Sequence, residues 1–123
     1  TTFDFLGVTI WILGFVCEVV SDYQLASFLN DTNNRGLLLT SGLWQYSRHP
    51  NYFGEITQWW GIFIMALSID GGLLTIIGPL TITFLIVKIS GIPLLEKKMA
   101  ENPAFLAYKN KTSMLIPWLP RGE

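Results

Sequence analysis

The sequence has too few metal-binding and redox-active side chains for several kinds of site. It contains one histidine and one cysteine in 123 residues, whereas a structural zinc site needs about four such ligands. The single cysteine, Cys17, cannot form a disulfide within the chain, and it stands in an apolar run, so we interpret it as a packing residue. We therefore predict no metal site.

Charge is scarce as well. Only 14% of the residues are charged and the net charge is −1, so the chain lacks the basic excess of a nucleic-acid-binding protein, and we expect no nucleic-acid partner. It also lacks a GxGxxG fingerprint and a P-loop, and its length and pattern exclude a Rossmann domain. Hydrophobic residues make up half of the chain, with a mean hydropathy of +0.42. This balance is typical of a membrane protein.

Long apolar runs predict an all-α integral membrane helical bundle with about three transmembrane helices, followed by amphipathic helices near the C-terminus. The expected spans cover residues 3–28, 50–69 and 73–89. Pro79 should kink the third span, which membrane bundles tolerate. Two shorter helices are expected over residues 94–100 and 103–109.

The length leaves room for one domain, which we assign to residues 1–123. The chain begins without methionine, and no basic region precedes the first apolar run, so no signal peptide is evident. We expect this domain to be a piece of a longer protein.

Polar chemistry concentrates in residues 42–55, GLWQYSRHPNYFGE. Pro50 disfavours helix at the preceding residue and suits a first helical turn, so a helix should begin there. Asn51 and Glu55 then share a face, and Arg48 and His49 stand just before the helix N-terminus. That end of a helix attracts anions, and neighbouring cations strengthen the attraction, which favours a phosphate-bearing cofactor. The alternative is that the two cations only anchor a helix end at lipid headgroups.

A second polar pair lies on the first apolar segment. Glu18 and Asp22 are four residues apart and share a helix face, which on a membrane helix should turn toward protein or a wet cavity. The alternative places both in the headgroup zone. Ser47 beside the two cations is interpreted as a backbone cap rather than a nucleophile.

Residues 42–55 closely resemble the C-terminal region of steroid 5-alpha-reductase-like membrane proteins. Further motifs agree in order and spacing, so that the resemblance spans nearly the whole chain. They are Ser21-Asp22-Tyr23-Gln24, Asn34-x-Gly36, Trp59-Trp60-Gly61, Ser90-Gly91-Ile92-Pro93, Glu96-Lys97, Tyr108, Thr112-Ser113 and Ile116-Pro117. Isoprenylcysteine carboxyl methyltransferases carry a run similar to Arg-His-Pro-x-Tyr-x-Gly alone.

The resemblance implies the C-terminal, cofactor-binding part of a membrane reductase. Such enzymes use NADPH to reduce an activated carbon–carbon double bond, and NADH is the alternative cofactor here. In the steroid reductase pattern, the matching residues Asp22, Asn51 and Glu55 line the cofactor pocket. Related sterol reductases contact the dinucleotide with residues that match four positions of this chain: Arg48, Asn51, Tyr52 and Tyr108. Glu96 and Lys97 fall where that branch has a charged pair, and His49 completes the motif.

The sequence departs from the steroid enzymes in two respects. Those enzymes lack the Arg-His-Pro form of the motif, and they use a histidine in the final helical region, whereas this chain has no histidine after His49. Their carbonyl-polarising glutamate and tyrosine lie in N-terminal helices that precede the part matched here. We therefore assign no catalytic residue, and we expect this piece alone to show no turnover.

Two other functions stay open at this stage: a membrane methyltransferase using S-adenosylmethionine, and a non-catalytic membrane fragment. All eight Lys and Arg lie in residues 29–50 or from Lys88 onward, so the positive-inside rule places the motif loops in the cytoplasm and Asp70 outside. The expected membrane is the bacterial inner membrane or the endoplasmic reticulum. The expected partners are the bilayer, an apolar lipid or steroid-like substrate, and the N-terminal helices of the same protein.

Overall fold

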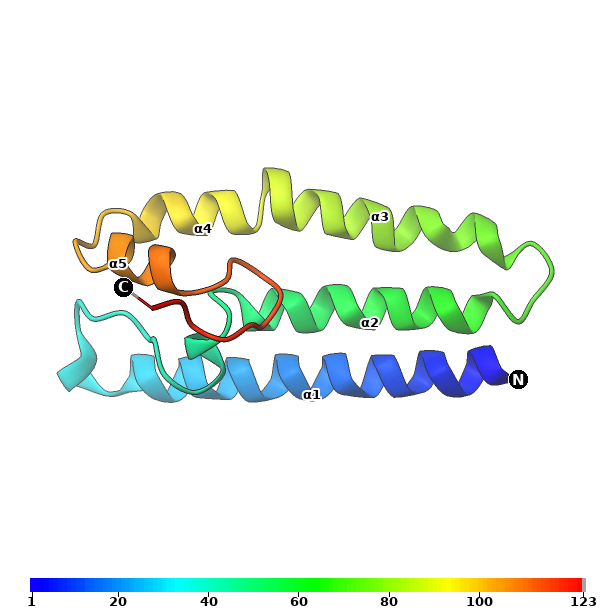
Figure 1. Ribbon diagram of the computed structural model, residues 1–123, viewed down its shortest axis with the longest axis horizontal. Helices are drawn as coiled ribbons and strands as arrows, with labels where there is room; N and C mark the ends of the chain where they lie inside the picture. Colours follow the sequence, from blue (N-terminus) through cyan, green and yellow to red (C-terminus); the bar gives the residue numbers. More distant parts are fainter. Residues whose placement is uncertain (123) are drawn as a thin grey trace.

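The computed structural model describes residues 1–122, and the regular structure of that part is helical. Three long helical rows lie side by side, and short helices and an extended tail gather at one end (Figure 1). The elements are α1 (Thr2–Asn30), η1 (Thr32–Asn34), η2 (Gly42–Gln45), α2 (Pro50–Ala66), η3 (Gly72–Ile76), α3 (Ile77–Phe84), the π-helical η4 (Leu85–Ile89), α4 (Ile92–Met99) and α5 (Phe105–Lys111). The predicted all-α class is confirmed.

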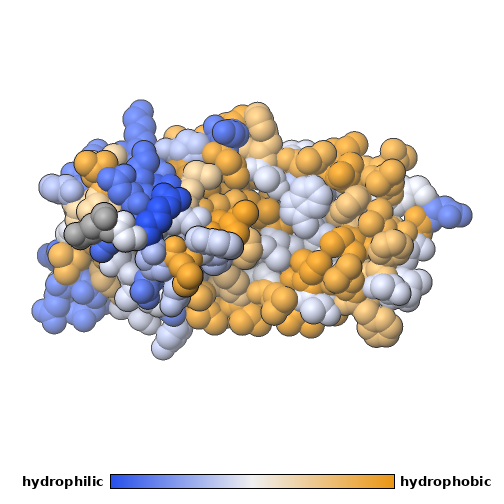
Figure 2. Space-filling view, viewed as in Figure 1, coloured by the Kyte–Doolittle hydropathy of each residue, from blue (hydrophilic) through white to orange (hydrophobic). Residues whose placement is uncertain are grey.

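Two of the rows are long and apolar enough to cross a membrane: α1, with 29 residues, and the continuous stretch Gly72–Met99, with 28. On the face shown, hydrophobic side chains predominate along the long helices, and hydrophilic ones gather at the end that carries α5 (Figure 2). α2 between the two rows has 17 residues. By length and composition two rows qualify as spans, and the third predicted span, over α2, stays a prediction.

Helix α2 begins at Pro50, as predicted. The third row consists of η3, α3, η4 and α4, with Pro79 in the first turn of α3 directly after η3 and a π-helical stretch further along. The kink expected at Pro79 stays a prediction. The amide groups of Ser90 and Gly91 both donate to the carbonyl of Leu85, at 2.8 and 3.5 Å, which makes a π-helical step. Pro93 follows this step in the first turn of α4, and because it has no amide hydrogen it cannot donate an α-helical bond to the carbonyl four residues earlier.

Helices α1 and α2 pack with their backbones in direct contact. Gly7, Gly14 and Ser21 recur at seven-residue intervals on α1 and are buried, as are Gly54 and Gly61 on α2. A Cβ atom added to Gly54 would lie 2.5 Å from the carbonyl oxygen of Gly14, and one added to Gly61 would lie 2.8 Å from that of Gly7. Small residues give membrane helices this close approach, and here they bring Asn51 and Glu55 alongside α1.

Candidate functional site

The motif segment before α2 is fixed by hydrogen bonds to two distant parts of the chain. The indole Nε1 of Trp44 donates to the carbonyl of Ser21 on α1, at 3.1 Å. The hydroxyl of Tyr108 on α5 donates to the carbonyls of Trp44 and Ser47, at 2.7 and 3.3 Å. Trp44 and Tyr108 are buried, so these bonds hold the segment between α1 and α5.

Ser47 links the motif segment to the C-terminal tail. Its hydroxyl accepts from the amide of His49, at 3.0 Å, and donates to the carbonyl of Leu115, at 2.7 Å. The amide of Arg48 donates to the carbonyl of Ser113, at 2.8 Å. The Ser47 hydroxyl thus bonds to main-chain groups, and the C-terminal tail holds Arg48 and His49 in place.

Arg48, His49 and Glu96 form one buried cluster. The Nη1 atom of Arg48 lies 3.2 Å from Oε1 and 3.1 Å from Oε2 of Glu96, and Nε2 of His49 lies 2.7 Å from the same Oε2. Arg48 and His49 are 6% and 1% exposed. The guanidinium also lies 6.0 Å from the centre of the Phe105 ring, while its Nε is buried without a hydrogen-bond partner. One carboxylate therefore serves both side chains at once.

Burial sets the protonation of this cluster. It lowers the pKa of His49 below its ordinary value, against the opposing effect of Glu96, so at neutral pH the imidazole is neutral and Nε2 donates to the carboxylate. Burial also lowers the pKa of Arg48, with Glu96 opposing, but arginine has a very high starting value and stays charged. Burial raises the pKa of Tyr108, which keeps its hydroxyl a donor.

A cavity of about 210 Å³ lies between the end of α1, the loop before η2, and α4. Three candidate residues, Arg48, His49 and Asn51, line it together. The remaining lining side chains are apolar: Leu25, Phe28, Leu29, Leu37, Leu38, Leu39, Trp44, Leu95 and Met99. The site is thus a cavity with a mostly apolar lining and one polar wall, which residues 48–51 supply.

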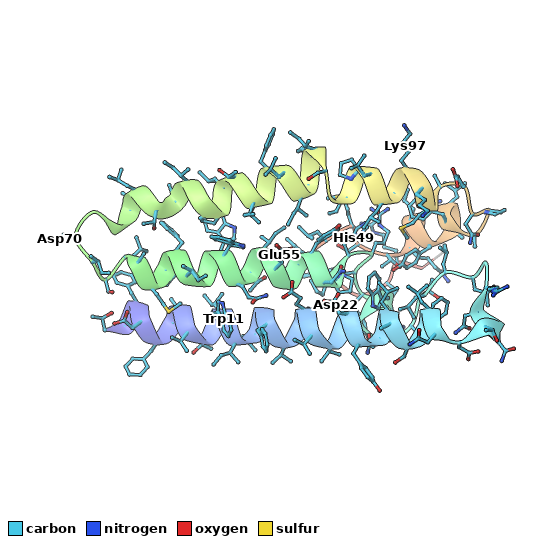
Figure 3. The ribbon with its side chains drawn as sticks, turned by 180° about the vertical axis from the view of Figure 1, so that it is seen from behind. Trp11, Asp22, His49, Glu55, Asp70 and Lys97 are labelled. Atoms are coloured by element: carbon cyan, nitrogen blue, oxygen red, sulfur yellow. The ribbon has the colours of Figure 1, made fainter. Side chains whose placement is uncertain are left out.

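The other candidate carboxylates lie along the α1–α2 contact (Figure 3). Gln58 donates to Glu18 across the two helices, at 3.0 Å, so Glu18 turns toward protein, as its helix face predicted. Glu55 is half-buried and close enough to Glu18 and Asp22 to interact electrostatically with both, while Asp22 is exposed. Neither Asp22 nor Glu55 lines the cavity.

The eight candidate residues therefore occupy neighbouring but distinct places. Arg48, His49 and Glu96 contact one another, and the Tyr52 ring lies 5.7 Å from that of His49. Tyr108 faces a separate hollow near residues 40–45. Their roles toward a cofactor stay predictions. Sequence reasoning missed the structural residues Ser21 and Phe105, although the seven-residue spacing of Ser21 from the α1 glycines was a usable signal.

A family model described as "Protein of unknown function (DUF1295)" matches residues 1–112. The chain belongs to this steroid 5-alpha-reductase-like family. Its similar proteins include 3-oxo-5-alpha-steroid 4-dehydrogenase 1 of Mus musculus, 29% identical over 65 residues, which are 53% of this chain and 26% of the relative. The Homo sapiens protein of the same name is 29% identical over 66 residues, with coverage of 54% and 26%.

These matches cover about a quarter of each relative's length. No solved structure matches the chain. The resemblance predicted from the motifs is confirmed, and the relatives give no support to the methyltransferase alternative.

Proposed function

We propose that this chain is the cofactor-binding part of an NAD(P)H-dependent membrane reductase, which reduces a carbon–carbon double bond in a lipid or steroid-like substrate. The observation that carries the proposal is the shared cavity wall of Arg48, His49 and Asn51, in a family related to a steroid 4-dehydrogenase. Family membership supports the reaction class, and the polar wall supports the place of binding.

The residues present fit the polar parts of a nicotinamide dinucleotide. Arg48 is a buried guanidinium whose Nε has no partner, which suits a phosphate oxygen. The side-chain amide of Asn51 can both donate to and accept from a carboxamide. The cavity of about 210 Å³ is smaller than ordinary ligand pockets, which run from about 300 to 1,000 Å³. The cavity therefore accommodates only part of such a molecule.

When bound, a reduced nicotinamide supplies the hydride for the double bond. The residues of this chain bind and orient it: Arg48 neutralises phosphate charge, Asn51 holds the carboxamide, and Glu55 accepts from ribose hydroxyls or the carboxamide. The reaction also needs a proton near the substrate carbonyl. We place that proton donor in the N-terminal helices, so this chain supplies the hydride side of the site.

The proposal includes a location. The bilayer surrounds the apolar helices, the N-terminal helices of the same protein complete the site, and the motif loops face the cytoplasm, in a bacterial inner membrane or the endoplasmic reticulum. The clustering of hydrophilic side chains at the α5 end of the molecule supports a common aqueous side for these loops (Figure 2).

A titration of the full natural protein in lipid nanodiscs tests the proposal. We expect NADPH or NADH to quench tryptophan fluorescence saturably and S-adenosylmethionine to have no effect. Asn51→Ala should weaken dinucleotide binding, whereas Asn33→Ala, in an exposed turn, should not. Binding of S-adenosylmethionine without dinucleotide binding would overturn the proposal. Oxidation of NADPH by residues 1–123 alone would contradict the placement of the proton donor elsewhere.

A further inference from the structure

Helix α4 is held at its first residue and through the turn that follows it, where the side chain of Asn102 donates to the carbonyl of Gly36, at 2.8 Å. Ile92, its first residue, is 2% exposed and packs in a core cluster with Ile56 and Ile86. No other residue of α4 is fully buried, and Leu94 and Leu95 are 61% and 41% exposed. Burial of apolar surface therefore fixes the first turn of the helix and contributes little beyond it.

Beyond its first turn, α4 contacts the motif segment through Glu96. It lies one turn beyond Ile92, and its carboxylate takes the Nη1 donor of Arg48 and the Nε2 donor of His49, at 3.1 and 2.7 Å. Leu95 lines the cavity on this same helix, so α4 forms one of its walls. Breaking the contacts of this carboxylate would leave that wall held by the core contacts of Ile92 at one end and by the exposed Asn102 hydrogen bond at the other.

A hinge precedes α4. The π-helical step places the amides of Ser90 and Gly91 on one carbonyl, and Pro93 cannot donate a main-chain hydrogen bond. The step is visible between α3 and α4 (Figure 1). Regular α-helical hydrogen bonding is therefore interrupted there, and a rotation about Ile92 would move Glu96 without unfolding α3.

We propose that α4 is a lid on the cavity and that Glu96 is its latch, occupying the donors of Arg48 and His49 until an anionic ligand replaces it. The inference rests on the proposed function for the identity of that ligand, a nicotinamide dinucleotide. A phosphate that takes the Nη1 donor of Arg48 must displace the Glu96 carboxylate from it, so the latch opens when the ligand binds there. The same opening enlarges the small hollow. Glu96 is then a competitor of the cofactor rather than a contact to it.

A ligand-free experiment tests the lid. Leu25 lines the cavity from α1, opposite α4, and is partly buried. In full protein with Cys17→Ser, we expect Leu25→Cys to react with a water-soluble maleimide at least about fivefold faster when Glu96→Gln is added, because the open fraction rises. Glu101→Gln, an exposed residue just beyond α4, is the charge-matched control and should change nothing. An unchanged rate in the Glu96→Gln variant would overturn the lid.

A second experiment keeps Glu96 and locks the lid. A cleavable bismaleimide joining Leu25→Cys on α1 to Met99→Cys on α4, both lining the cavity, should weaken NADPH binding at least about tenfold, and cleavage should restore it. Uncrosslinked Glu96→Gln should bind NADPH more tightly than wild type. Equal affinity of the locked and cleaved forms would refute the lid. If NADPH binds no form while maleimide labelling still rises with Glu96→Gln, the lid stands and the proposed cofactor falls.

Discussion

A single methyl group at the α1–α2 contact should destabilise the whole bundle. In Gly54→Ala the new Cβ would lie 2.5 Å from the Gly14 carbonyl oxygen and 2.7 Å from the Glu18 nitrogen. Ordinary contact begins at 3.4 Å, so the helices must separate by about 0.9 Å at this point. Both opposing atoms are main-chain atoms of a long helix, which cannot swing away as a side-chain end would.

The size of the effect follows from two opposing contributions. Overpacking costs about 1–3 kcal/mol, and a contact against rigid backbone belongs at the upper end of that range. Alanine in place of glycine within a helix stabilises the folded state by up to about 1 kcal/mol. We therefore expect Gly54→Ala to lower the free energy of unfolding by about 2 kcal/mol.

Gly78→Ala is the matched control, since it is also a helical glycine. Its Cβ would meet the Trp59 ring at 3.6 Å, which is ordinary contact, so it should be neutral or stabilising by up to about 1 kcal/mol. Reversible unfolding in bicelles, followed by tryptophan fluorescence, measures both variants. Equal stability of Gly54→Ala and Gly78→Ala would show that the two helices are not in backbone contact.

Three further predictions follow from other parts of the structure. Tyr108→Phe removes the buried donor to the carbonyl of Trp44 and should lower the free energy of unfolding by about 1–3 kcal/mol, while Tyr46→Phe, at an exposed ring, should have little effect in the same unfolding assay. Burial lowers the pKa of His49, so on acidification the unfolded chain binds a proton before the folded protein does, and the free energy of unfolding should fall as the pH drops below about 6.5. Unfolding measured across pH should show that His49→Gln removes this pH dependence. An unchanged pH dependence in the variant would mean that another group causes it. With the native cysteine removed, Asp70→Cys should react with an impermeant thiol reagent on intact cells; reaction only after lysis would reverse the proposed topology.

Local rules predicted the parts of the fold that depend on neighbouring residues. Pro50 predicted the start of α2 because its effect on backbone angles reaches only one residue. Pro79 lies in the first turn of α3, a position that a proline can occupy without a kink, so the expected kink stays a prediction. The π-helical step lies just before α4 and its Pro93, and no local sequence rule predicted it.

The candidate site shows where such rules stop. At the level of sequence, Arg48 and His49 are two cations before a helix N-terminus, and that position favours an anion from outside the chain. In the structure an anion comes from Glu96, which is 48 residues away along the chain from Arg48. A buried guanidinium needs a compensating charge whether or not a ligand is present, because desolvation of an unpaired ion is costly. Under the proposed lid, the carboxylate that compensates Arg48 in the closed form is the group that an anionic ligand displaces from Nη1.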